Sequence, residues 1–222
     1  MEPEPITDRE HPGKVDALWH VYLTVAVAIA LQIVLPEKLI VGPRFIIPGL
    51  EGLLLLALVL FNPEMPHRKV PAARFMAITM IAITSVANAG SLLILVRYLL
   101  RGGKADGHEL LFAAINLFLT NVIVFSLWYW EVDAGGPVRR HLEGMDKPDF
   151  LFPQYDVKSV APPGWKPTFI DYLYVSLTNA TAFSPTDTLP LTHTAKFLMG
   201  FQSLISLLTL VLVAARAVNI LS

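Results

Sequence analysis

The sequence contains no cysteine and few charged residues, and both absences narrow what the chain can do. Without cysteine there is no disulfide, no thiolate metal ligand and no cysteine nucleophile. Charged residues make up 16% of the 222 residues, whereas a soluble domain carries about 25%. The formal net charge is −1 at pH 7, so the chain lacks the basic surface of a nucleic-acid-binding protein, and we expect no nucleic-acid partner.

Signatures of enzymes are also scarce. His108 and Glu109 begin like the H-E-x-x-H motif of metalloproteases, but Phe112 stands where the second histidine belongs. No two histidines lie four residues apart, so a metal site on one helix has no support. The sequence has neither a phosphate-binding P-loop nor a G-x-S-x-G nucleophile motif. We therefore expect no enzyme, no catalytic residue, no metal and no other cofactor.

What the chain does contain is a large excess of apolar residues. Hydrophobic residues make up 54% of the chain and the mean hydropathy is +0.56. Apolar runs of about 18 residues or more are typical of membrane-spanning helices. We predict an all-α polytopic membrane protein in a lipid bilayer, with five transmembrane helices at 17–35, 45–61, 75–100, 110–130 and 195–221. The acidic first residues are unlike the basic start of a signal peptide, so we expect the first helix to be retained.

Two of the predicted helices carry polar residues that admit two interpretations. Glu51 is either an acid near the membrane interface that snorkels or caps the helix, or a buried acid that lines a polar pathway. Thr84, Asn88 and Ser91 are four and three residues apart, so they share one helix face. That face either packs closely against another helix or lines a wetted path.

A shorter apolar segment precedes the last predicted helix. Residues 138–167 are polar and rich in proline, which predicts a loop lying over one membrane face. Thr168 suits a helix N-cap, with Asp171 three residues further on. The run from Phe169 to Ala180 is only long enough, at about 1.5 Å per residue, to cover about half of the hydrocarbon core. It can enter a membrane but cannot cross it, which predicts a re-entrant half-helix.

The last predicted helix carries a narrow polar stripe. Gln202, Ser206 and Thr209 recur at spacings of four and three residues, and Val213 and Arg216 continue the same face. The stripe either packs against a neighbouring helix or faces water.

The residues around the predicted half-helix resemble a known family. Their pattern is similar to T-x-x-T-V-G-Y-G-D followed by x-x-P-x-T, the signature of the two-helix pore domain of tetrameric potassium channels. Thr178 and Thr181 match the two threonines, while Asp187, Pro190 and Thr192 match the D-x-x-P-x-T. The resemblance divides the chain into an N-terminal three-helix region, 1–107, and a pore module, 108–222, made of outer helix, loop, pore helix, filter and inner helix.

The centre of the filter departs from that family. In place of V-G-Y-G the chain has Ala182, Phe183, Ser184 and Pro185, followed by one extra residue, Thr186. Glycine tolerates the positive φ angles that turn successive carbonyls toward an ion, whereas proline fixes φ near about −65°. We therefore expect no potassium selectivity of the usual kind. A weaker resemblance is to uncharacterised bacterial membrane proteins with the same altered filter.

The resemblance implies a homotetrameric channel in a bacterial inner membrane, permeable to or weakly selective for monovalent cations. The pore and filter residues would be Thr178, Thr181, Ala182, Phe183, Ser184, Pro185, Thr186 and Asp187. Asp187 would place negative charge at the mouth, to which Glu131 and Asp133 would add. Gln202, Ser206 and Thr209 would line the inner cavity, and the C-terminus would be cytoplasmic. The alternative is a non-conducting accessory or scaffold protein that has kept the fold.

Overall fold

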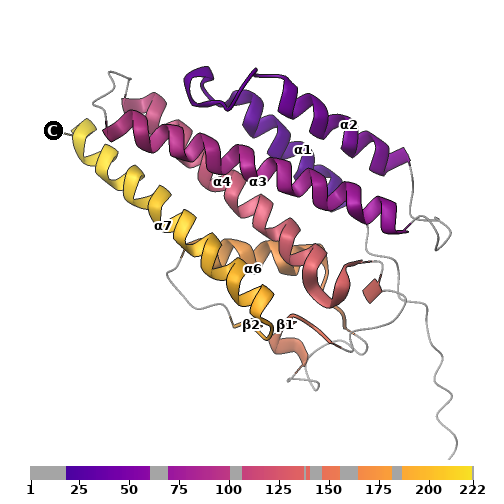
Figure 1. Ribbon diagram of the computed structural model, residues 1–222. Helices are drawn as coiled ribbons and strands as arrows, with labels where there is room; N and C mark the ends of the chain where they lie inside the picture. Colours follow the sequence, from indigo (N-terminus) through magenta and orange to yellow (C-terminus); the bar gives the residue numbers. More distant parts are fainter. Residues whose placement is uncertain are drawn as a thin grey trace, which may run out of the picture.

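The computed structural model describes residues 19–60, 70–100, 107–137, 139–140, 147–155, 165–181 and 187–221. Within them the protein is a bundle of α-helices (Figure 1): α1 (Trp19–Val34), α2 (Ile46–Leu60), α3 (Val70–Leu100), α4 (Gly107–Val132), α6 (Phe169–Thr181) and α7 (His193–Leu221). Short 3-10 helices lie at η1 (Glu37–Leu39), η3 (Asp133–Gly135) and η4 (Pro153–Tyr155). Two strands of two residues each, β1 (Phe150–Leu151) and β2 (Leu189–Pro190), pair antiparallel.

Three helices in the described part of the chain are long and apolar enough to cross a membrane, over Pro71–Leu100, Gly107–Gly135 and His193–Ala214. The expectation of a helical membrane protein is confirmed at this level. Helices α1 and α2 have 16 and 15 residues. They are therefore about 22–24 Å long, against a hydrocarbon core of about 30 Å. A count of five spanning helices stays a prediction because these two are short.

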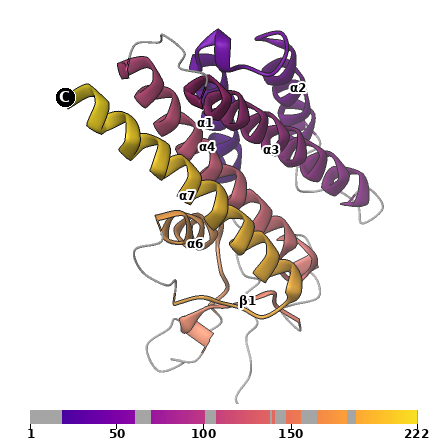
Figure 2. The same cartoon turned by 60° about the vertical axis from the view of Figure 1, so that its left-hand side comes forward.

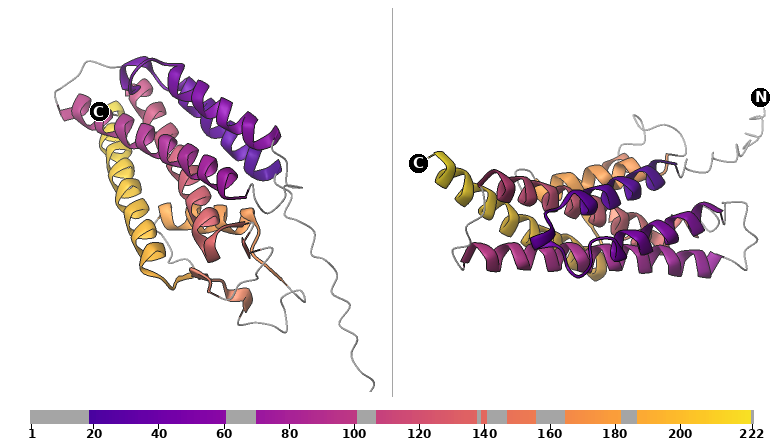
Figure 3. Two further views of the ribbon diagram at one scale, coloured as in Figure 1. Left: turned by 45° about the vertical axis from the view of Figure 1, so that its right-hand side comes forward. Right: turned by 90° about the horizontal axis from the view of Figure 1, so that it is seen from above.

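Helices α1, α2, α3, α4 and α7 alternate in direction between two ends of the bundle (Figure 3). We call the end that holds β1 and β2 the loop end. The apolar cluster nearer the loop end includes Val21, Met80, Trp130, Phe150, Phe169 and Ala195. The cluster nearer the opposite end includes Leu35, Leu39, Leu92, Leu95, Leu110 and Leu117. Helix α4 is central, because it packs on α1, α3, α6 and α7.

Helices α6 and α7 begin where the sequence provides caps. The Asp171 carboxylate accepts hydrogen bonds from the backbone nitrogen of Thr168 at 2.7 Å and from its hydroxyl at 2.9 Å. The predicted pairing of these two residues at the start of α6 is thus present. The Thr192 hydroxyl accepts a bond from the backbone nitrogen of Ala195 at 3.2 Å, which caps α7.

Candidate functional site at the end of α6

Helix α6 starts at the loop end, and β2, which comes after α6 in the chain, also lies at the loop end (Figure 2). Near the start of α6, the Tyr172 hydroxyl donates to the Asp133 carboxylate at 2.5 Å. The other oxygen of Asp133 accepts from the backbone nitrogens of Asp149 and Phe150 at 2.6 and 3.3 Å. Phe150 begins β1, which pairs with β2 after α6. Both ends of the segment from Tyr172 to Leu189 are therefore held beside Asp133.

The far end of α6 reaches about half-way along α4. The Ser176 hydroxyl donates to the carbonyl oxygen of Val122 at 2.6 Å. Val122 lies ten residues before Val132, the last residue of α4. Ten helical residues span about 15 Å, which is about half of a hydrocarbon core. If α4 spans the membrane, the C-terminal half of α6 lies near its middle.

Asp149 connects separate segments at the loop end through hydrogen bonds. Its carboxylate accepts from the backbone nitrogen of Ala134 at 3.0 Å and from the Thr192 hydroxyl at 2.5 Å. Its carbonyl oxygen accepts from the backbone nitrogen of Leu191 at 2.8 Å. Asp149 thereby joins the end of α4 to the start of α7, and Thr192 has a structural task at this junction in addition to capping.

A second polar network lies deeper, between α4, α6 and α7. The Gln202 side-chain nitrogen donates to the carbonyl oxygen of Ser176 at 3.0 Å and to its hydroxyl at 2.7 Å. The Gln202 side-chain oxygen accepts from the Tyr129 hydroxyl and, at 2.8 Å, from the Asn179 amide. Asn179 also donates to the carbonyl oxygen of Met199 at 3.0 Å. The network fixes the end of α6 to the middle of α7.

The polar stripe of α7 packs inside the chain. Gln202, Ser206 and Thr209 are 0%, 1% and 1% exposed. Ser206 accepts a hydrogen bond from Asn121 of α4 at 2.9 Å, and Thr209 donates to the carbonyl oxygen of Ile205 at 2.8 Å. Of the two interpretations of the stripe, helix packing describes this structure. A role of these residues in lining a cavity stays a prediction, and it needs this face of α7 to separate from α4.

The predicted filter residues are described only in part. Thr178 and Thr181 are half-buried, and their hydroxyls donate to carbonyl oxygens of α6 itself, at 2.9 Å to Tyr174 and at 3.1 Å to Thr178. Asp187 is exposed. The other predicted filter residues lie outside the described residues: Ala182, Phe183, Ser184, Pro185 and Thr186. A helix C-terminus carries a partial negative charge, so the end of α6 offers cations a favourable field.

Two acids expected to add charge to the mouth are instead buried. Glu131 and Asp133 are 3% and 0% exposed. Glu131 forms an ion pair with Arg74 of α3 at 3.1 Å. Asp133 is used by the hydrogen bonds that fix the loop end. Their charges hold helices together and do not face solvent, so the expected contribution to a charged mouth is wrong for this chain.

Burial also changes the pKa of a side chain in the loop that follows α4. Burial of Tyr155 and the nearby Asp133 carboxylate raise the pKa of the Tyr155 phenol to about 12. Arg140 lies over the Tyr172 ring at 5.2 Å and donates to the carbonyl oxygens of Trp130 and Asp133 at 2.7 Å. Among the described residues no group of three or more metal-ligating side chains comes together.

Sequence reasoning missed the residues that connect distant segments. Tyr129, Ser176 and Asn179 complete the network around Gln202, and Asp149 joins two loops. Asn179 lies between the two matched threonines, so its place beside the filter was visible in the sequence. Ser176 and Asp149 gave no such signal, because their partners lie 15 or more residues away. Asp149 itself bonds a residue 43 positions away.

Comparisons of the chain with protein-family models, with curated proteins and with solved structures find no match. The resemblance to potassium channels therefore rests on the residues quoted for it, Thr178, Thr181, Asp187, Pro190 and Thr192. Function must be argued from the geometry around α6.

Proposed function

We propose that the protein is an ion-channel-like integral membrane protein, permeable to or weakly selective for monovalent cations. The observation that carries this proposal is the path of the chain around α6. Both ends of the segment from Tyr172 to Leu189 are held at the loop end. Between them, Ser176 contacts α4 about half-way along α4. A segment that enters and leaves on one side of a membrane is a re-entrant loop, which is tolerated where protein or water surrounds it.

Charge supports cations over anions as the permeant species. The C-terminal end of α6, with the half-buried Thr178 and Thr181, carries the negative end of the helix dipole. Exposed Asp187 adds a carboxylate further along the chain. Rings of carboxylates and carbonyl dipoles favour cations in pores. One such loop cannot enclose a path alone, so the proposal includes a homotetramer, multi-pass in a bacterial inner membrane with its C-terminus in the cytoplasm.

A non-conducting accessory or scaffold protein is the second candidate, and a specific observation favours it. The polar groups at half-depth bond to one another within one chain: Gln202 and Ser206 are buried and bonded to α6 and α4. A conducting cavity needs polar groups that face water. A closed network of this kind is what a protein would retain if it had kept the fold and lost the pore.

The assembly state separates the two candidates. We expect a tetramer for the channel, measured by light scattering or native mass spectrometry in mild detergent. A monomer or dimer would exclude the pore, because too few loops would surround the axis.

Cation flux into liposomes then tests the pore residues. We expect Asp187→Asn and Thr181→Ala to change the flux or its selectivity. Glu37→Gln is the matched control, since it also removes an exposed carboxylate but lies at the opposite end of the bundle. A flux that is the same in the wild type and in both pore variants would reject the assignment of Asp187 and Thr181 to the pore. A tetramer without flux would favour the scaffold.

A further inference from the structure

Glu51 is a carboxyl group buried far from the α6 site. It lies in the middle of α2 and is 0% exposed. Its two oxygens lie 2.7 Å from the side-chain nitrogen of Gln32 in α1 and 2.8 Å from the hydroxyl of Thr84 in α3. In the described part of the chain these are its polar contacts, and neither partner is charged. An ionised carboxylate in such surroundings is costly unless it is paired.

The geometry at Thr84 indicates that Glu51 carries a proton. The Thr84 oxygen lies 2.8 Å from a Glu51 oxygen and 2.9 Å from the carbonyl oxygen of Met80. A threonine hydroxyl has one hydrogen to donate but can accept as well. Both contacts are full hydrogen bonds only if Thr84 donates to Met80 while the neutral acid of Glu51 donates to Thr84. A protonated Glu51 therefore accounts for both contacts of the Thr84 hydroxyl.

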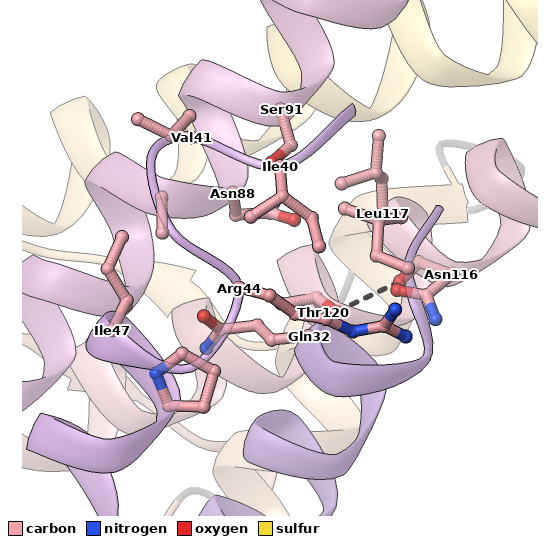
Figure 4. A pocket seen from close by; sticks show the side chains of 13 residues that line it. Gln32, Ile40, Val41, Arg44, Ile47, Asn88, Ser91, Asn116, Leu117 and Thr120 are labelled. Carbon is pink, nitrogen blue, oxygen red and sulfur yellow. Dashed lines mark hydrogen bonds between the residues drawn. The ribbon is translucent and has the colours of Figure 1, made fainter. Parts of the chain in front are cut away.

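A small cavity with apolar and polar lining lies next to this acid (Figure 4). It encloses about 20 Å³, whereas one water needs about 10–15 Å³. Its polar lining comes from four segments and includes Gln32, Arg44, Asn88, Ser91, Asn116 and Thr120. Gln32 belongs to both places, because its amide nitrogen bonds Glu51 and its side chain lines the cavity.

Two buried atoms of the cavity residues have no hydrogen-bond partner among the described residues: the side-chain oxygen of Asn88 and the Nε nitrogen of Arg44. One is an acceptor and the other is a donor. Water is the small molecule that satisfies both, because it accepts from Arg44 and donates to Asn88. An anion would leave Asn88 unsatisfied, and a metal cation would leave the Nε donor of Arg44 unsatisfied.

We propose that Glu51 is a proton-binding site separate from the α6 site, and that water in the neighbouring cavity exchanges this proton with the membrane face on which Arg44 lies. In the transfer step the Gln32 side chain, which separates Glu51 from the cavity, moves aside; the O–H bond of Glu51 then breaks and its proton joins a cavity water to form hydronium. The carboxylate left behind accepts hydrogen bonds from Gln32 and Thr84. The proton leaves past Arg44, and no oxidant or reductant is involved.

The charged groups around this path are few. Among the described residues that line the cavity, Arg44, in the connection between α1 and α2, is the charged one, and it is paired with Glu37. The groups that α1, α3 and α4 present to it are neutral, namely Gln32, Asn88, Ser91, Asn116 and Thr120. A change in proton occupancy near the cavity therefore belongs to Glu51, with Arg44 favouring its release.

Infrared spectroscopy of the whole protein in mild detergent tests this site. A neutral carboxylic acid gives a carbonyl stretch that ionised carboxylates lack, and the stretch shifts when deuterium replaces the proton. We expect such a band at neutral pH, its loss in Glu51→Gln, and its shift on transfer to deuterium oxide. Filling the cavity with Asn88→Leu should slow the shift severalfold, whereas Gln32→Ala, which removes the barrier between acid and cavity, should speed it.

Val86→Leu is the matched control, because it enlarges a side chain of α3 that is 71% exposed and outside the cavity lining. If Asn88→Leu does not fold, Ser91→Val fills the same cavity. The absence of a band sensitive to Glu51→Gln would overturn the proposal. So would exchange rates that stay at the wild-type value in both the cavity variant and Gln32→Ala. None of these readouts depends on tetramer formation or ion flux.

Discussion

Gln202 of α7 is bonded to both polar groups of Ser176 in α6: its side-chain nitrogen donates to the Ser176 carbonyl oxygen at 3.0 Å and to the hydroxyl at 2.7 Å. Gln202 is 0% exposed, and its side-chain oxygen accepts from Tyr129 and Asn179 as well. One side chain therefore satisfies groups from two other helices. Gln202 therefore helps to fix the position of α6 against α4 and α7.

Replacing Gln202 by leucine should destabilise the protein. The variant leaves the Ser176 carbonyl and the Tyr129 hydroxyl without their partner in a buried place, which we expect to lower the free energy of unfolding by about 3 kcal/mol. Thermal unfolding in detergent should show a midpoint lower by about 6 °C or more. Phe201→Leu is the control, because Phe201 is exposed on the neighbouring position of α7. Equal midpoints for Gln202→Leu and wild type would contradict the role of the network.

Asp133 and Tyr172 should prove energetically coupled. Tyr172 donates to a buried carboxylate, and a hydrogen bond to a charged group contributes about 2 kcal/mol. A double-mutant cycle of Asp133→Asn and Tyr172→Phe should give a coupling energy of this size. Tyr174→Phe, on the exposed side of the same helix, should show none with Asp133→Asn. Additive effects of the first pair would mean that the two groups do not interact in solution.

Tyr155 should titrate late. Its folded pKa is raised to about 12 by burial and by Asp133, while an unfolded tyrosine has a pKa of about 10. Because the folded state holds the proton more tightly, the stability that comes from the neutral phenol is complete below about pH 10 and is lost as pH rises through about 12. The difference in phenolate absorbance between the wild type and Tyr155→Phe should reach half of its final value at about pH 12. A midpoint near the unfolded value would show that this loop is open to water.

The helices could be predicted from the sequence because apolar runs and their stop signals are local. The predicted half-helix from Phe169 to Ala180 differs by one residue from α6, which ends at Thr181. The predicted start of α3 at Phe75 was five residues late: the helix begins at Val70, and Pro71 is tolerated in its first turn. The pairing of β1 with β2 had no signal, since strands of two residues show no periodicity.

The partners of polar residues could not be predicted in the same way. Periodicity placed Gln202, Ser206 and Thr209 on one face, but it does not reveal whether that face meets water or a helix. What this face contacts depends on residues far along the chain, such as Asn121, which bonds Ser206 from 85 positions away. For the same reason the sequence left two interpretations of Glu51. In the structure Glu51 is buried and is in contact with Gln32 and Thr84.

Gly136 should not tolerate a side chain. Its φ is +103°, a conformation that L-residues rarely adopt. A Cβ atom there would lie 3.2 Å from the carbonyl and side-chain oxygens of Glu131 and 3.4 Å from Arg74 Nε. Gly136→Ala would therefore strain the backbone and press on the ion pair that joins α3 to α4, and we expect a loss of about 2 kcal/mol.

Gly52→Ala is the matched control for Gly136→Ala. A Cβ at Gly52 meets nothing within 4 Å, and alanine in a helix interior is favoured over glycine by about 0.5–1 kcal/mol. The free energy of unfolding, measured by denaturation in detergent, should therefore fall for Gly136→Ala and rise for Gly52→Ala. Adding Arg74→Gln to Gly136→Ala should produce less than the sum of the separate losses, because both changes weaken the same ion pair with Glu131. Fully additive losses would place the effect of Gly136→Ala in the backbone alone.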